Sequence, residues 1–380
     1  MIVGVLKETF PGERRVALVP AEITRFTKRK LEVLIESGAG EAAGHLDAEY
    51  TAKGASIVPR QDIFAKAEII LGVRFAGASD TASANDAARP GQVIIGFMDP
   101  LGKPVGMQAL TTQGATTLAL ELIPRITRAQ SMDALSSMAT IAGHHAVLLA
   151  ASNLPKLFPM LMTAAGTLTP SKVFVLGVGV AGLQAIATAK RLGGVVEAYD
   201  VRPEVKEQVQ SVGGKFVELA IETSNAGDAG GYAKQQSAGF YARQQELLAG
   251  HLRDADVIIT TAAIPGKKAP ILVTESMMKG MRPGSVVIDL ASETGGNVEG
   301  TVAGQKIVRN DVMIIGPTNI ASEHPAAASQ MLARNLSNLV TLITTKEGQL
   351  ELNRDDDVIK GCLVSFGGSI VHERVVGGAA

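Results

Sequence analysis

The fold is decided by one stretch of the chain, KVFVLGVGVAG at residues 172–182. Its first half is an apolar run typical of a buried strand, and a helical pattern begins directly after it. Three glycines, Gly177, Gly179 and Gly182, have the spacing G-x-G-x-x-G in the strand–turn–helix context that this fingerprint requires. The first permits a tight turn, the second lets backbone approach a pyrophosphate, and the third lets helix and strand pack closely. The stretch therefore predicts a dinucleotide-binding domain.

An acidic residue follows the glycines at about the 20-residue spacing of the fingerprint. This residue is Asp200, which ends the predicted strand Val195–Tyr199. A carboxylate there accepts hydrogen bonds from the adenosine ribose and repels a 2′-phosphate, which favours NAD(H) over NADP(H). Arg202 is a cation of the type that accepts a 2′-phosphate, but the charge of Asp200 should dominate. We therefore expect Arg202 to lie over the adenine or in solvent.

Short apolar runs alternate with helical patterns on both sides of this stretch, as in parallel sheets covered by helices. Because the series restarts after a helical region, two sheets in series are the simplest account. We expect an α/β fold with two Rossmann-like, doubly wound parallel-sheet domains separated by a cleft, where ligands commonly bind. The runs are Ile2–Leu6, Glu32–Ile35, Glu68–Val73, Val93–Phe97 and Thr117–Leu120, then Val173–Leu176, Val195–Asp200, Val257–Thr261, Ser285–Leu290 and Val312–Ile315.

Two helical patterns mark the domain boundaries. The first, Ser131–Ala151, lies between the two series of strands, and the second, Ala326–Thr344, follows the last strand. The second helix can return the chain to the first domain, leaving a Gly-rich, weakly patterned tail. We therefore predict a discontinuous α/β domain from residues 1–136 and 322–380 and an NAD(H)-binding domain from residues 137–321.

Residues 222–245 lack periodicity and are rich in Gly and small residues. A long irregular insertion within a domain is commonly a functional loop or lid. We predict a mobile loop in which Tyr232 closes onto a ligand. The alternative is a surface excursion with no role in binding.

The composition limits the kinds of partner. The chain has 380 residues and a net charge of −1, so bulk charge does not hold it on nucleic acid. Charged residues make up 19% of the chain and there are 41 glycines, which suggests a surface that meets a protein partner. The single cysteine, Cys362, excludes an internal disulfide and is expected to be a buried apolar residue. No segment is expected to span a membrane.

A polar segment, RITRAQSMDALSS at residues 125–137, precedes the first boundary helix. The amide of Gln130 matches both the donor and the acceptor of a nicotinamide carboxamide, while Arg125, Asp133 and Ser136 could orient the ring and its ribose. The alternative is a helix-capping segment with an ion pair from Arg125 or Arg128 to Asp133.

The six histidines form no recognisable general-base or metal-binding pattern. Oxidation of an alcohol or amine needs such a base near the substrate. Transfer of a hydride from one nicotinamide to another needs none, only two rings held face to face.

Several motifs together resemble the NAD(H)-binding component of proton-translocating nicotinamide nucleotide transhydrogenases. They are KETFPGERRVALVP at residues 7–20, RITRAQSMDALSS at 125–137, MTAAGTLTPSKVFVLGVGVAGLQAIATAKRLGG at 162–194 and GGYAK at 230–234. The resemblance covers essentially the whole chain. The RxxRAQSMD block distinguishes this family from alanine dehydrogenases, which share the fold and the first motif.

The resemblance implies which residues meet the cofactor. It places Arg125, Gln130, Asp133 and Ser136 at the nicotinamide. It places residues 177–182, including Val180 and Ala181, at the pyrophosphate, Asp200 at the ribose and Tyr232 on the mobile loop. The remaining implied nucleotide-binding residues are Arg202, Ala262, Pro265, Glu293 and Asn319.

The resemblance also implies a reaction and its partners. The chain would form a homodimer and transfer a hydride from NADH to NADP+ bound on a separate NADP(H)-binding component. A membrane subunit that conducts protons would couple this transfer to proton translocation. The chain would lie on the cytoplasmic face of the inner membrane as a peripheral component.

Some stretches depart from the related families. Where alanine dehydrogenases carry a substrate lysine and a histidine, this chain has Gly72-Val73-Arg74 and Phe97-Met98-Asp99-Pro100. Ala321 replaces the proline that usually follows the Thr-Asn pair at residues 318–319, and Glu293 occupies an acidic position with an orienting or a structural role. Two rival hypotheses stay open, an alanine-dehydrogenase-like oxidoreductase and a non-enzymatic NAD(H)-sensing module.

Overall fold

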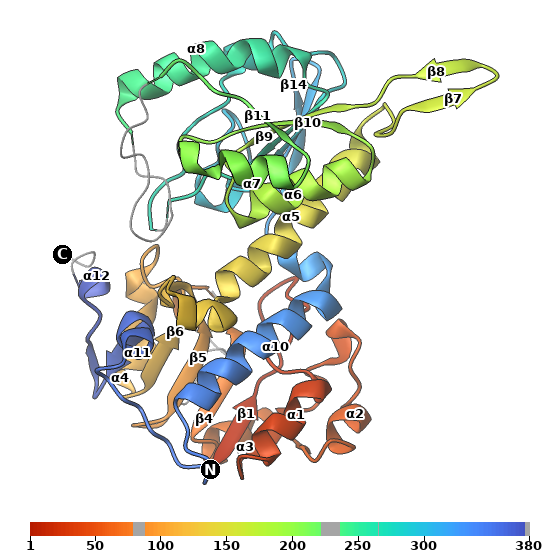
Figure 1. Ribbon diagram of the computed structural model, residues 1–380. Helices are drawn as coiled ribbons and strands as arrows, with labels where there is room; N and C mark the ends of the chain where they lie inside the picture. The colour runs from red at the N-terminus through yellow and green to blue at the C-terminus, as the bar shows by residue number, and fades with distance from the viewer. Residues whose placement is uncertain (79–87, 222–235, 265, 377–380) are drawn as a thin grey trace. The chain divides into compact units, whose positions relative to one another are not determined.

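The chain divides into two compact units (Figure 1). Unit 1 comprises residues Met1–Met138 and Ala321–Ala380, and unit 2 comprises Ala139–Ile320. The computed structural model describes residues 1–78, 88–221, 236–264 and 266–376. The predicted loop residue Tyr232 and the predicted nucleotide-binding residue Pro265 lie outside these ranges.

The described part of unit 1 contains an eight-stranded sheet with the order β17-β16-β6-β5-β4-β1-β2-β3. Strands β1 to β6 are parallel, but β16 runs antiparallel to β6 and to β17. The expectation of a purely parallel sheet and an unpatterned C-terminal tail is therefore wrong at this edge. The strands are β1 (Ile2–Val5), β2 (Glu32–Glu36), β3 (Ser56–Val58), β4 (Ile69–Arg74), β5 (Val93–Phe97), β6 (Thr116–Ala119), β16 (Leu363–Phe366) and β17 (Ser369–Ile370).

Unit 2 contains a seven-stranded sheet with the order β11-β10-β9-β12-β13-β15-β14 among its described residues. All neighbours are parallel except β14 and β15. A separate antiparallel hairpin, β7–β8, extends away from the sheet (Figure 1). The strands are β7 (Leu161–Thr163), β8 (Gly166–Leu168), β9 (Lys172–Leu176), β10 (Val195–Tyr199), β11 (Lys215–Phe216), β12 (Val257–Thr260), β13 (Val286–Asp289), β14 (Lys306–Arg309) and β15 (Val312–Ile315).

Helices follow most of the strands, which gives the predicted α/β fold with Rossmann-like parallel sheets. In unit 1 the helices are α1 (Pro20–Thr27), α2 (Asp47–Thr51), α3 (Arg60–Lys66), α4 (Gln108–Thr112), α10 (Pro325–Leu342), α11 (Asp357–Cys362) and α12 (Glu373–Val376). In unit 2 they are α6 (Val180–Arg191), α7 (Lys206–Ser211), α8 (Ala238–Asp254) and α9 (Glu275–Met278). Helix α5 (Ala134–Asn153) contains the boundary between the units.

Two predictions about single elements need correction. The irregular segment expected up to Gln245 ends earlier, because α8 begins at Ala238 after an N-cap in which Ser237 Oγ accepts a hydrogen bond from Phe240 N. Helix α5 is long and apolar enough to cross a membrane by length and composition, although no such segment was expected. Core helices pass the same test, and Ala146 and Ala150 of α5 are buried in unit 2.

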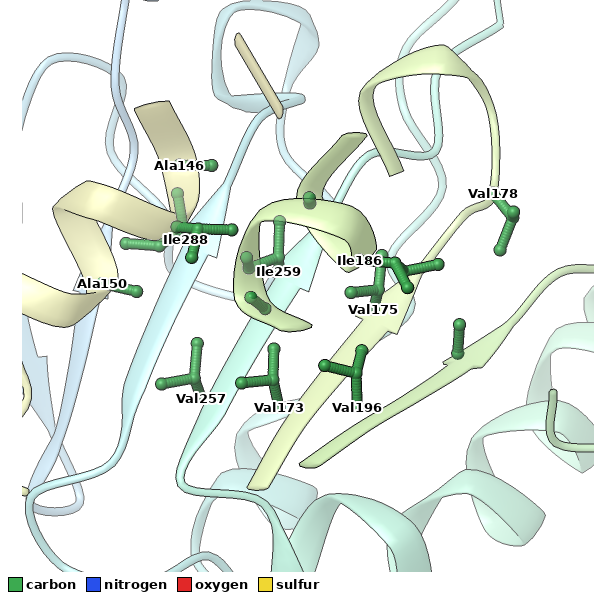
Figure 2. Close-up of a cluster of buried hydrophobic side chains, with 14 of the residues drawn as sticks. Ala146, Ala150, Val173, Val175, Val178, Ile186, Val196, Val257, Ile259 and Ile288 are labelled. Atoms are coloured by element: carbon green, nitrogen blue, oxygen red, sulfur yellow. The ribbon is translucent and has the colours of Figure 1, made fainter. Parts of the chain in front are cut away.

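Alternate residues of each strand in unit 2 face opposite layers of core. Val173 and Val175 of β9 pack with α5 and α6 on one face, whereas Phe174 and Leu176 pack with α8 and α9 on the other. Helices thus cover both faces, which explains why these strands are continuous apolar runs. Figure 2 shows part of the first cluster, including Ala146, Ala150, Val173, Val175, Val178, Ile186, Val196, Val257, Ile259 and Ile288.

The buried carboxyl group of Glu121 makes the stability of unit 1 depend on pH. Its Oε1 accepts hydrogen bonds from the backbone of Met98 and Asp99, both at 2.7 Å. Its Oε2 is buried without a partner among the described residues. Burial, reinforced by the charge of Asp99, raises the pKa of Glu121 from 4.5 to about 7. The folded state therefore holds a proton that the unfolded state releases between these two values.

We predict that unit 1 loses stability as the pH rises from 4.5 to 7, because the buried carboxylate must then be charged. Glu121→Gln should be more stable than the wild-type chain at pH 8, by up to about 3 kcal/mol, and similar to it at about pH 5. Calorimetric unfolding at the two pH values measures this difference. An equal difference at both values would assign the effect of the substitution to packing instead.

Candidate dinucleotide-binding site

The glycine-rich turn of unit 2 joins β9 to α6. Gly177 follows β9 with a φ of 94°, a left-handed conformation that glycine adopts without strain. Its carbonyl oxygen accepts a hydrogen bond of 2.9 Å from Thr261 Oγ1, which ties the turn to the end of β12. Gly179 is the N-cap of α6 and its backbone is extended. The first glycine is thus required by the backbone conformation of the turn.

The second and third glycines serve different purposes. A Cβ atom on Gly182 would lie 2.0 Å from the carbonyl oxygen of Gly177, so this glycine allows α6 to pack on the turn. A Cβ atom on Gly179 would meet nothing within 4 Å. The protein itself does not require a glycine at position 179, whereas a phosphate approaching the helix N-terminus would. The turn therefore fits a pyrophosphate group.

Asp200 lies directly after β10 and points back at this turn. Its Oδ2 accepts a hydrogen bond of 2.7 Å from the backbone N–H of Val178. Arg202 forms a bidentate ion pair with it, with Nε 2.8 Å from Oδ1 and Nη2 2.7 Å from Oδ2. The expectation that Arg202 lies in solvent is wrong, because only 12% of its side chain is exposed in this pair.

Behind the turn, a buried network that the sequence did not reveal holds the segment after β12. Asn297 accepts a hydrogen bond of 3.0 Å from Ala262 N and donates to the carbonyl oxygens of Ala262 and Pro270, at 2.8 and 2.9 Å. Asp289, at the end of β13, in turn accepts from Asn297 N and Thr301 Oγ1. Asn297 thus fixes the backbone of Ala262, one of the predicted nucleotide-binding residues.

We predict that Asn297→Ala loosens this segment. The substitution leaves three backbone groups without their partner, at about 1–3 kcal/mol for each buried group. The Kd for NADH should rise about tenfold as Ala262 moves, equivalent to about 1.4 kcal/mol. Thr301→Val is the matched control, because it removes a 2.8 Å bond to Asp289 and leaves the Ala262 contacts intact. Calorimetric titration that finds equal NADH affinities in both variants would contradict a positioning role for Asn297.

Glu293 and Asn319 lie together in unit 2. The backbone N–H of Asn319 donates a hydrogen bond of 3.2 Å to Glu293 Oε2, and Asn319 has a φ of 47°. Asn tolerates this left-handed conformation better than most residues. The two predicted residues are therefore neighbours, and Glu293 contributes at least to the shape of the loop after β15.

In unit 1, the polar segment forms a short 3-10 helix, Thr127–Met132, that leads into α5. Asp133 caps α5, since its Oδ1 accepts from Ser136 N at 2.8 Å and its Oδ2 from Ser136 Oγ at 2.6 Å. Arg125 Nε lies 3.9 Å from Asp133 Oδ2, which is a loose ion pair. The capping alternative is thus present for Asp133.

The rest of this segment is held at its two sides. Arg128 pairs with Asp356 through two hydrogen bonds of 2.9 Å, not with Asp133 as the alternative allowed. The carbonyl oxygen of Ser131 accepts hydrogen bonds from Asn335 and Asn338 of α10. Between these anchors Gln130 is exposed, and its amide has no hydrogen-bond partner among the described residues. A fixed backbone thus presents an uncommitted amide.

Arg74 stands in a stretch where alanine dehydrogenases carry a substrate lysine, and it is committed to a buried cluster in unit 1. Its Nε donates to Glu13 Oε2 at 3.0 Å, and Arg15 donates to both oxygens of the same carboxylate. Although burial opposes it, the two arginines lower the pKa of Glu13 to about 2. Glu13 therefore already neutralises the cations that an external carboxylate would need.

The chain matches two family models over most of its length. Residues 4–142 match "Alanine dehydrogenase/PNT, N-terminal domain" and residues 146–373 match "Alanine dehydrogenase/PNT, C-terminal domain". An NAD(P) transhydrogenase alpha subunit of Rhodospirillum rubrum is 42% identical over 384 residues, covering 100% of both chains. Alanine dehydrogenase of Mycobacterium tuberculosis is 28% identical over 383 residues, covering 99% of this chain and 96% of that one.

A solved structure agrees with these similarities. The crystal structure of transhydrogenase from Sinorhizobium meliloti superimposes with a TM-score of 0.88 at 42% identity, covering 98% of this chain and 100% of that one. These relatives support NAD(H) binding and an NAD-dependent oxidoreductase role. Both the sequence motifs and the whole-chain similarities therefore place the chain in the alanine dehydrogenase/PNT family, among close relatives that are transhydrogenase alpha subunits.

Proposed function

We propose that the chain is the NAD(H)-binding component of a proton-translocating transhydrogenase. It delivers a hydride from NADH to NADP+ held on a separate component. The observation that carries the proposal is the turn at Gly177–Gly182, in which Gly179 leaves open space at a helix N-terminus while Asp200 points at the same turn. This arrangement fits the pyrophosphate and the ribose of a dinucleotide.

Each group of residues has a distinct task in this proposal. The N–H groups at the start of α6, with Val180 and Ala181, bind the pyrophosphate through hydrogen bonds and the helix dipole. Asp200 accepts hydrogen bonds from the adenosine ribose. Ala262, held by Asn297, and the Glu293–Asn319 pair shape the walls along the nucleotide. Bound NADH supplies the transferable hydride at its nicotinamide ring.

The residues of the unit 1 segment orient that ring. Gln130 binds the carboxamide through an amide that nothing else in the described chain engages, while Asp133 and Ser136 fix the turn that carries it. Arg125 supplies a nearby positive charge. Since none of these groups has to take up or release a proton, the arrangement suits direct hydride transfer better than oxidation of an amine.

The partners belong to the proposal as well. We assign the chain an NADP(H)-binding component, a membrane subunit that conducts protons, and a peripheral position on the cytoplasmic face. A homodimer would cover the apolar side chains at the hairpin, since Met160, Met162 and Leu168 are 57%, 77% and 51% exposed. Light scattering that finds only monomers would remove the homodimer from the proposal.

One assay separates this function from that of an alanine dehydrogenase. The purified chain, given NADH, pyruvate and ammonium, should oxidise NADH no faster than a protein-free blank. The reason is that Arg15 and Arg74 are held by Glu13 and that the histidines form no general-base pattern. Robust turnover would instead establish amino-acid oxidation as the activity.

Asp200→Ala tests the ribose assignment. Loss of the carboxylate should weaken NADH binding by about tenfold to 100-fold, the cost of one or two hydrogen bonds to a charged group. The preference for NADH over NADPH should narrow, because the repulsion of a 2′-phosphate is removed. Calorimetric titration of both nucleotides measures the ratio, and a ratio equal to that of the wild-type chain would count against this assignment.

A further inference from the structure

The Asp200 carboxylate has no acceptor position left for a ligand. Its Oδ1 accepts hydrogen bonds from Arg202 N at 2.9 Å and Arg202 Nε at 2.8 Å. Its Oδ2 accepts from Val178 N and Arg202 Nη2, both at 2.7 Å. A carboxylate offers about four lone-pair sites, so these four donors saturate it. A ribose diol needs two of them.

Only one pair of these donors can leave. The N–H groups of Val178 and Arg202 belong to backbone that is fixed beside the sheet, where Gly177 N donates to Tyr199 O at 2.9 Å. The guanidinium of Arg202 is at the end of a side chain with several rotatable bonds. It also binds in the fork geometry, two parallel bonds, with which two neighbouring hydroxyls would compete.

We propose that Arg202 is a specificity-determining residue that occupies the ribose position on Asp200 and is displaced when an adenosine ribose binds. This inference rests on the proposed NAD(H) site and adds a competitor within it. The displaced guanidinium stacks over the adenine, since its flat face suits an aromatic ring. It thereby remains beside the ribose.

The displacement has two consequences of opposite sign for ligands. A ribose with a free 2′-hydroxyl gains the Asp200 contacts but first has to break the bidentate pair. A ribose with a 2′-phosphate meets a carboxylate whose charge the nearby guanidinium offsets. Arg202 therefore reduces the discrimination that a lone Asp200 would give.

The test uses two probes that lack the nicotinamide, ADP-ribose and 2′-phospho-ADP-ribose, so that unit 1 residues proposed for the nicotinamide do not enter. Calorimetric titration of the full chain gives the ratio of the two Kd values. In Arg202→Gln, which removes the charge, the ratio of the 2′-phospho Kd to the ADP-ribose Kd should rise at least about tenfold, or about 1.4 kcal/mol. The Kd for ADP-ribose itself should stay the same or fall.

Two further variants complete the design. Arg202→Lys keeps the charge without the fork and should keep the ratio within about threefold of the wild-type value, that is within about 0.7 kcal/mol. Arg243→Gln on α8, an exposed arginine of the same unit paired with Glu246, should leave both affinities unchanged.

The opposite results identify which idea fails. A weaker ADP-ribose affinity in Arg202→Gln, with an unchanged ratio, would mean that Arg202 only holds Asp200 in place, and the inference would be wrong. An Arg202→Lys ratio as high as that of Arg202→Gln would also overturn it, because the charge would then have no effect. If the wild-type chain binds neither ADP-ribose nor NADH, the proposed function itself fails.

Discussion

Gly179→Ala is expected to raise the Kd for NADH by about 10- to 100-fold, equivalent to the loss of one charge-assisted hydrogen bond of about 1.5–3 kcal/mol. The thermal stability of the chain should not change, because a Cβ atom at this position meets nothing within 4 Å. The methyl group would instead occupy the space through which a pyrophosphate approaches the N-terminus of α6. Calorimetric titration with NADH, together with a melting curve, measures both quantities.

Two glycines of the same unit provide the comparison. Gly250 of α8 also has open space around its Cβ position, so Gly250→Ala should leave NADH affinity unchanged. Gly182→Ala should destabilise unit 2 as well as abolish binding, because its Cβ atom would lie 2.0 Å from the backbone oxygen of Gly177. Wild-type NADH affinity in Gly179→Ala would rule out this turn as the pyrophosphate site.

The second large effect is expected at Gln130. Gln130→Ala should slow hydride transfer to a partner-bound NADP+ by about 100-fold, the usual cost of misplacing a reacting group by about 1 Å. The Kd for NADH should change by less than about threefold, because the pyrophosphate and ribose contacts in unit 2 supply most of the affinity. Single-turnover kinetics and titration separate the two quantities.

The control for Gln130 is another exposed glutamine of unit 1. Gln108 lies in α4, where it donates a hydrogen bond of 3.2 Å to Thr112 Oγ1. Gln108→Ala should affect neither transfer nor binding. If Gln130→Ala also transfers hydride at the wild-type rate, residues 125–136 would have only the structural role of leading into α5 and capping it.

The sequence was most informative where strands are apolar and continuous. The run Val312–Ile315 and the run Val93–Phe97 match β15 and β5 residue for residue. Such runs are readable because helices cover both faces of these sheets. The glycine turn was equally readable, since its glycines meet local requirements of the backbone and of an approaching phosphate.

Elements stabilised by distant contacts were missed. Strand β16 lies in a Gly-rich tail, and Ser365 is buried in it only because its hydroxyl bonds Ala115 O and Thr117 Oγ1 of unit 1. The hairpin β7–β8 has only three residues in each strand and no buried face, so no periodicity marks it. No local pattern distinguishes such strands from loops.

The polar contacts of the site divide in the same way. Asp200 was identified from its spacing, but its saturation by Arg202 depends on the side-chain geometry after β10. Asn297 and Asp289 were missed because buried polar residues cannot be told from surface ones without their partners. The one available signal was the position of Asp289 at the carboxyl end of a parallel strand, where ligand sites of α/β folds gather.

The most direct test of the account follows the hydride itself. The chain is loaded with NADH carrying two deuterium atoms at C4 of the nicotinamide and is mixed with an NADP(H)-binding transhydrogenase component loaded with NADP+. Mass spectrometry should find one deuterium in each NADPH formed, because the hydride passes directly between the rings without exchange with water. NADPH without deuterium, or no NADPH from a chain that binds NADH, would contradict the proposed function.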